Sequence, residues 1–74
     1  MSNYKLVTKD KSGAKTVLEE FKTSARAKHN AEKLIKNGIF DNHLIYSMHV
    51  VETYSKHYEV DKVNYFNPAL QKTK

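Results

Sequence analysis

The sequence predicts a single small α+β domain with the element order β-β-α-β-β, in which a mainly antiparallel sheet carries one helix on one face. Three observations lead to this prediction: two β-type segments joined by a glycine turn, one amphipathic segment that stops at Gly38, and two further segments rich in β-branched and aromatic residues. A chain of 74 residues has room for one domain. We expect residues 1–66 to form this domain and residues 67–74 to form a flexible C-terminal tail.

The first two segments, residues 4–8 and 16–22, flank the sequence Asp10-Lys11-Ser12-Gly13. Gly13 supplies the positive φ that a hairpin loop needs, so we predict a β-hairpin. Alternation along the two strands predicts one buried face, formed by Tyr4, Leu6, Val17 and Phe21. Glu19 interrupts this face, which indicates an edge strand where an inward or rim charge discourages aggregation.

The next segment reads as a helix that begins with Thr23 or Ser24 as its cap and runs to about Asn37. Gly38 follows at the position where helices commonly end in a left-handed residue. One apolar stripe lies along this helix, made of Ala27, Ala31, Leu34 and Ile35. Because two of its four members are alanine, we expect the helix to approach the sheet closely.

Residues 44–54 and 58–66 are rich in strand-forming types, and Ser55-Lys56-His57 between them is a candidate turn. The alternative is a helix over residues 44–58, whose face would hold Leu44, Met48, Val51 and Tyr58. The β-branched and aromatic content favours strands. A bulge near Asp61-Lys62 would bring Val60 and Val63 to the same face.

Composition excludes several classes of protein. The chain has no cysteine, which removes disulfides, thiolate metal sites and cysteine nucleophiles. Its beginning resembles no signal peptide, and its apolar runs are short, such as Val50-Val51, so we expect no contact with a membrane. A soluble cytoplasmic protein, monomeric or homodimeric, is the expectation.

The formal net charge of +5 lies entirely in the first half of the chain. Residues 1–37 hold nine basic and four acidic side chains, whereas residues 38–74 hold four of each. Such asymmetry indicates a polyanion or an acidic protein surface as partner. Arg26 is the sole arginine, however, and lysine-rich usage from an AT-rich genome explains the composition equally well.

Two groups of basic residues are candidates for binding DNA, RNA or an acidic partner. The first is the basic helix ridge, which lies opposite the apolar stripe and consists of Arg26, His29, Lys33 and Lys36. The second is the group of hairpin lysines around Gly13, namely Lys9, Lys11 and Lys15. A solvated helix face and a solubilising turn are the alternative interpretations of these two patterns.

Aromatic residues alternate with polar ones in the second half of the chain. Tyr46, Tyr54, Tyr58 and Tyr65 are candidates for stacking on nucleobases or for anchoring a protein interface. We expect at least two of them to lie in the core instead, because the chain has few large apolar residues. The glycine and phenylalanine offsets typical of an RNA-recognition sheet are missing.

Catalytic and metal-binding patterns are missing from the sequence. The spacing of His43, His49 and His57 fits neither a helical nor a strand pair of ligands. The chain has no nucleophile elbow and no glycine-rich phosphate loop. We therefore expect no enzyme, no metal and no cofactor.

The sequence Phe21-Lys22-Thr23, followed by Ala27, Ala31, Leu34 and Gly38, resembles a common type of small protein from phages and mobile elements of low-GC bacteria. This resemblance covers residues 4–54, and folding explains all of its residues. The β-β-α-β-β order, beginning with Tyr4-Lys5-Leu6, is similar to the streptococcal immunoglobulin-binding domains, a likeness of architecture that implies no function.

Two functions follow as expectations. The first is a small basic, non-catalytic protein of phage type that binds nucleic acid or assists a nucleic-acid process through the basic first half of the chain. The alternative is a protein-interaction module, such as a small inhibitor of a host protein, that acts through a strand edge or the tyrosine-rich face.

Overall fold

A β-hairpin opens the chain in the computed structural model, which describes residues 3–41 and 43–70. It joins β1 (Asn3–Asp10) to antiparallel β2 (Lys15–Phe21). The Asp10 carboxylate holds the turn, because its Oδ1 accepts hydrogen bonds from the backbone N–H groups of Ser12, at 2.9 Å, and Ala14, at 3.0 Å. Gly13 has φ +94°, as the predicted turn requires.

Helix α1 (Ser24–Lys36) follows with the predicted caps at both ends. The Thr23 hydroxyl accepts a hydrogen bond from the Arg26 backbone N–H at 3.2 Å, so Thr23 is the N-cap. Asn37 is the C-cap, and Gly38 takes the left-handed conformation with φ +94°. A side chain at Gly38 would strain the backbone, whereas its Cβ would meet only the end of the exposed Asp41 side chain, which can move aside.

The second half forms another antiparallel hairpin, β3 (Ile45–Ser55) and β4 (Tyr58–Phe66). The helix alternative for residues 44–58 is therefore wrong, and the strand prediction is confirmed. The four strands lie in the order β2-β1-β3-β4, with antiparallel pairing throughout. The predicted α+β fold with the order β-β-α-β-β is thus confirmed.

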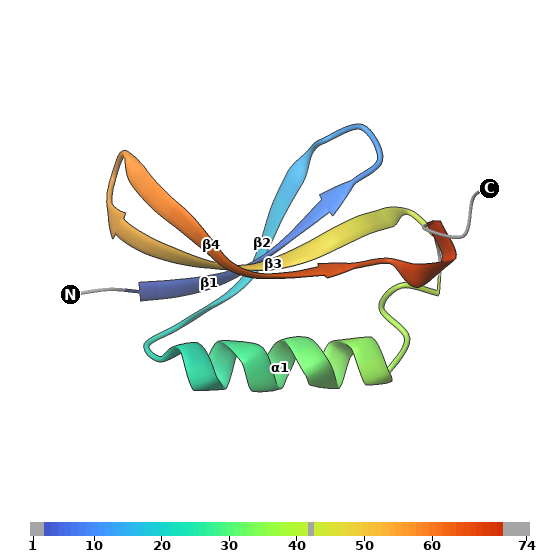
Figure 1. Cartoon of the computed structure of the whole chain (residues 1–74), viewed down its shortest axis with the longest axis horizontal. Helices are drawn as coiled ribbons and strands as arrows, with labels where there is room; N and C mark the ends of the chain where they lie inside the picture. Colours follow the sequence, from blue (N-terminus) through green and yellow to red (C-terminus); the bar gives the residue numbers. More distant parts are fainter. Residues whose placement is uncertain (1–2, 42, 71–74) are drawn as a thin grey trace.

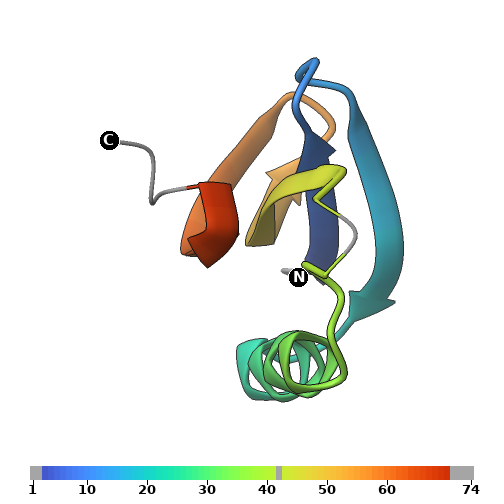
Figure 2. The ribbon, with the colours of Figure 1, turned by 90° about the vertical axis from the view of Figure 1, so that its right-hand side faces the viewer.

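Helix α1 covers one face of the sheet, which we call the helix face. Figure 1 shows α1 beneath the middle of the sheet, while the two hairpin turns rise away from it on opposite sides; Figure 2 shows the same two layers end-on. Ala27 and Ala31 are 0% exposed, and this close contact lets the helix reach the central strands β1 and β3. The buried core on this face consists of Leu6, Ala27, Ala31, Phe40, Met48 and Val50.

Val17 does not lie on the predicted face of the sheet, because β2 contains one extra residue. Pairing shifts along β1 so that Leu6 stands opposite Glu19 but Val7 stands opposite Val17, which leaves Leu18 as a bulge. Val17 therefore lies on the other face of the sheet, the open face, where it is 50% exposed. The prediction that Val17 shares the buried face with Phe21 is wrong, because simple alternation ignores the extra residue.

The predicted bulge in β4 is confirmed. Val63 pairs with Val50 and Asp61 pairs with Val51, so Lys62 is the extra residue. As a result Val60 and Val63 share the helix face, and Val63 packs against the core.

Contacts with the domain extend beyond residue 66, within the region expected to be a tail. Asn67 is buried, and its side-chain amide donates hydrogen bonds to the carbonyl oxygens of Phe40 and Ile45 at 3.1 and 2.9 Å. The short 3-10 helix η1 (Pro68–Leu70) follows, whereas residues 71–74 of the predicted tail lie outside the described residues. In the described part of the chain, no helix is long and apolar enough to span a membrane.

The contact between α1 and the sheet leads to a prediction at Ala31. Ala31→Leu should lower the free energy of unfolding by about 1–3 kcal/mol, because the larger side chain overpacks a site without free space. Ala25→Leu, at an exposed position of the same helix, is the matched control and should be nearly neutral. Urea denaturation measures both variants. Equal stability of Ala31→Leu and the wild type would show that the helix does not need the small residue.

Candidate functional site

The basic helix ridge lies on the side of α1 turned away from the sheet. Arg26, His29, Lys33 and Lys36 are all exposed, and so are Lys22 and Lys28 beside them. Because Ala27 and Ala31 hold the opposite side of the helix against the sheet, this orientation is fixed by the core. Glu32 is the one acidic residue in the helix. The structure therefore gathers the four predicted ridge residues on one surface.

Three of the four carboxylates in the second half of the chain have partners outside the ridge. Glu59 pairs with Lys5, and Glu52 lies 3.5 Å from the Lys62 ammonium group. The hydrogen bond from Lys5 lowers the pKa of Glu59, which keeps this carboxylate charged. Asp61 lies 3.6 Å from His49. Among residues 3–41 and 43–70, no ridge residue forms an ion pair, so the positive charge of the ridge is not neutralised within this part of the protein.

The hairpin lysines are far from the ridge. Lys9, Lys11 and Lys15 surround the β1–β2 turn, which rises on the side of the sheet opposite α1 in both views (Figures 1 and 2). Lys9 pairs directly with Lys15, so two like charges stand side by side at this turn. The structure does not bring the two predicted basic groups together into one surface.

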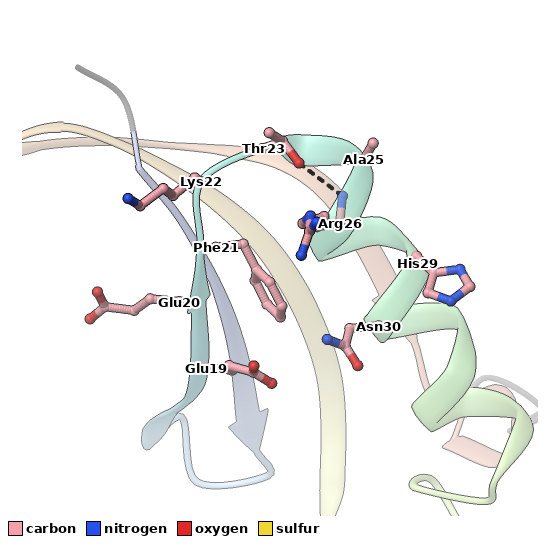
Figure 3. A pocket seen from close by; sticks show the side chains of 9 residues that line it. All are labelled: Glu19, Glu20, Phe21, Lys22, Thr23, Ala25, Arg26, His29 and Asn30. Carbon is pink, nitrogen blue, oxygen red and sulfur yellow. Dashed lines mark hydrogen bonds between the residues drawn. The ribbon is translucent and has the colours of Figure 1, made fainter.

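A groove of about 750 Å³ runs between β2 and the first half of α1. In Figure 3, Phe21 points into this groove from β2, and Asn30 points toward it from the helix, whereas Glu20 and Lys22 point away. Arg26 also lines it, so the groove borders one end of the ridge. Its acidic wall is Glu19, which Figure 3 shows directed toward α1.

Both outer strands of the sheet carry features that oppose pairing with another strand. β2 contains the bulge at Leu18 and presents the charged Glu19 on the helix face. β4 contains the bulge at Lys62, with Asp61 next to it. Bulges and charges of this kind protect natural sheet edges from adding a further strand. Glu19 is exposed on an outer strand, which fits the rim form of the predicted inward or rim charge.

The four candidate tyrosines separate into three environments. Tyr54 and Tyr58 stack on each other beside the β3–β4 turn, with ring centroids 5.2 Å apart and planes inclined by 26°. Tyr46 lies at the other end of β3, where its ring meets the edge of Phe66. Tyr65 packs against the core from the helix face. Tyr46, Tyr54 and Tyr58 are thus exposed, and Tyr54 and Tyr58 are the two of them that stack on each other. The expectation that at least two of the four lie in the core is wrong, because only Tyr65 packs against it.

A buried carboxylate holds Tyr54, one member of this pair, in place. Glu52 accepts hydrogen bonds from the hydroxyl of Tyr54 at 2.8 Å and from that of Tyr4 at 3.2 Å. The hydrogen bond to Glu52 is the main cause of a raised pKa at Tyr54, while burial is the main cause at Tyr4. Both hydroxyls therefore remain protonated donors at neutral pH.

A polar network on the open face was not predicted from the sequence. His49 contacts the Ser47 hydroxyl through Nε2 and the Asn64 side-chain oxygen through Nδ1, both at 2.7 Å. Together with Asp61, which lies 3.6 Å from His49, Ser47 and His49 match the residue types of a hydrolytic triad. Ser47 is 1% exposed, however, so its hydroxyl is closed to a substrate. The network satisfies buried polar groups in the sheet, and it depends on the register that places His49 opposite Asn64.

No group of three potential ligand side chains that could hold a metal ion occurs in the described ranges 3–41 and 43–70. His43 and His57 are exposed, each next to a turn. Comparison of the chain with protein-family models, curated proteins and solved structures finds no match.

The hydrogen bond between Tyr54 and Glu52 leads to a prediction about the pKa of Tyr54. Glu52→Gln should lower the pKa of Tyr54 toward its ordinary value, because the Tyr54 hydroxyl loses its hydrogen bond to a charged carboxylate and a neutral amide no longer repels the phenolate. The pKa of Tyr65, raised mainly by burial, should stay unchanged and serves as the control. Titration of each ring by NMR measures these values.

The same shifts predict how stability depends on pH. The pKa values of Tyr4 and Tyr54 are higher in the folded chain than in the unfolded chain, where tyrosine loses its proton near pH 10. Above about pH 10 the folded chain therefore binds more protons than the unfolded chain, and the free energy of unfolding should fall as the pH rises. This fall should be smaller in Glu52→Gln when each variant is compared with its own stability at neutral pH. An equal fall in both proteins would show that Glu52 does not cause the shifts.

Proposed function

We propose that this protein is a small non-catalytic factor that binds nucleic acid through the basic helix ridge. The observation that carries the proposal is that no ridge residue forms an ion pair in the described part of the chain, while Glu52, Glu59 and Asp61 have other partners. Positive charge without an internal partner favours an external anion. The resemblance to small phage proteins fits an accessory role of this kind.

The dimensions of α1 support the proposal. Its 13 residues extend about 20 Å, a length over which each strand of duplex DNA presents several phosphates. Lysine and arginine contacts to phosphate position a protein on nucleic acid without reading its sequence. We therefore expect little sequence preference.

The second candidate is a protein-interaction module, such as an inhibitor of a host protein. The groove between β2 and α1 favours it, because an extended segment beside β2 would meet Phe21 there. The bulge at Leu18 and the charged Glu19 weigh against strand addition at this edge. If the partner is a protein, the charge pattern favours an acidic surface of that partner, bound to the ridge.

Charge reversal tests the proposed function. Lys33→Glu/Lys36→Glu should abolish binding to duplex DNA without unfolding the domain, because both side chains are exposed and point away from the core. Lys11→Glu/Lys15→Glu is the matched control, with the same change of charge on the opposite side of the sheet, and should retain binding. Fluorescence anisotropy measures the affinity, and circular dichroism checks the fold of each variant.

Salt dependence provides an independent measurement on the wild type. If Arg26, Lys33 and Lys36 each neutralise one phosphate, the logarithm of the binding constant should fall against the logarithm of salt concentration with a slope of about −3. Failure of the wild type to bind DNA or RNA at about 50 mM salt, where screening is weak, would refute the nucleic-acid proposal. The acidic protein partner would then replace it.

A further inference from the structure

The open face of the sheet is the large surface that α1 leaves uncovered. Helix α1 packs on the helix face, and the two hairpin turns rise on the other side (Figures 1 and 2). Both outer strands carry bulges that oppose the addition of a further strand, so the face of the sheet is more available to a partner than its edges. Sheets commonly pack face to face, about 10 Å apart, through faces of this kind.

Charges on the open face balance, although the whole chain has a formal net charge of +5. The strand registers place lysines and carboxylates on this face in equal number, namely Lys5, Lys9, Lys15, Glu20, Glu59 and Asp61. The basic ridge on α1, in contrast, repels the ridge of a second copy of the chain. Two copies can therefore approach each other through their open faces without repulsion between net charges.

The charges of β2 are separated along the strand. Lys15 pairs with Lys9 next to the β1–β2 turn, and Glu20 pairs with Lys5 toward the other end of the strand. Val17 lies on the same face between these two rows and is 50% exposed. Within residues 3–41 and 43–70, neither Lys15 nor Glu20 forms an ion pair. The open face of β2 therefore carries a positive charge on one side of Val17 and a negative charge on the other.

We propose that two copies of this chain form a symmetric dimer through their open faces, with the two-fold axis along the row that contains Val17 and its partner Val7. A rotation by 180° about this row exchanges the rows on either side of it. Lys15 of each copy then lies opposite Glu20 of the other copy, so two equivalent ion pairs form. This inference goes beyond nucleic-acid binding and does not depend on it, because the ridge remains exposed on the outside of both copies.

The twist of the sheet fits this symmetry. β1 and β3 are antiparallel neighbours, so the β1–β2 and β3–β4 turns lie at opposite corners of the sheet, and both corners rise on the open side. A sheet twisted in this way is shaped like a saddle. Rotation about the central row places the raised corners of one saddle over the lowered corners of the other. Lys9 then approaches the ion pair between Lys5 and Glu59 of the second copy, whose charges cancel.

The size of the open face sets the expected affinity. Four strands about 4.8 Å apart, with 7 residues in β2, give a face of about 19 Å by 23 Å. Val7 and Val51 on this face are each only 6% exposed, so dimerisation buries little further apolar surface in its middle. Interfaces of standard size bury about 800 Å² on each partner. We therefore expect a weak dimer, with a Kd between about 1 µM and 1 mM, whose geometry is determined by charge.

A charge swap tests the proposed pairing, with sedimentation equilibrium of the whole chain as the measurement. Lys15→Glu and Glu20→Lys should each weaken dimerisation at least about tenfold, because like charges then face each other at two equivalent contacts. The combined variant Lys15→Glu/Glu20→Lys restores opposite charges and should dimerise like the wild type. Repulsion between net charges alone predicts a different result, since Lys15→Glu lowers the net charge and would strengthen association.

A second variant tests the position of the axis. Val17→Asp brings two carboxylates together at the two-fold axis and should weaken dimerisation at least about tenfold. Ala25→Asp introduces the same side chain at an exposed position of α1, and this matched control should leave the dimer unchanged. Circular dichroism checks that each variant is folded.

Three results would overturn the inference. The first is a wild type that stays monomeric at every concentration up to about 1 mM. The second is a dimer that Val17→Asp and the single charge variants leave unchanged, which would show that another surface forms it. The third is a charge swap that does not restore dimerisation. None of these results affects the proposal for the ridge, which is tested by DNA binding.

Discussion

The close contact of Ala27 and Ala31 with the middle of the sheet is the constraint on which the rest of the structure depends. Because these side chains end at Cβ, the helix axis lies near the central strands, and the larger residues Leu6, Met48 and Val50 fill the core from the sheet side. This contact also determines the rotation of α1 about its own axis. The outward position of the ridge is therefore a consequence of packing.

Much of the fold follows from local signals in the sequence. Thr23, Gly13 and Gly38 act through backbone geometry close to themselves, so turns and helix ends are predictable. Bulges are harder to predict. The sequence indicates an extra residue only when strict alternation would place two apolar residues of one strand on opposite faces of the sheet. Val60 and Val63 conflict and reveal the bulge in β4, whereas β2 offers the alternation of Val17, Glu19 and Phe21 without such a conflict.

The candidate site likewise contains features that local sequence patterns predict and features that depend on the three-dimensional arrangement. The ridge was predictable because helical periodicity alone groups Arg26, Lys33 and Lys36. The separation of the hairpin lysines from the ridge depends on how the two hairpins diverge from the helix, which no local pattern contains. The contact of His49 with Asn64 depends on the register between β3 and β4, and the stacked tyrosines depend on the turn that joins these strands.

The distribution of charge connects these features. Lys5 on β1 reaches Glu59 on β4 across the intervening strand β3, and the bulge at Lys62 places an ammonium group near the buried Glu52. A helix that meets the sheet through alanines keeps its opposite side beyond the reach of those carboxylates. Charge at these positions of the sheet is thus compensated within the fold, whereas charge on the ridge must be compensated by solvent ions or by a bound anion. A polyanion that displaces such ions gains binding free energy from their release.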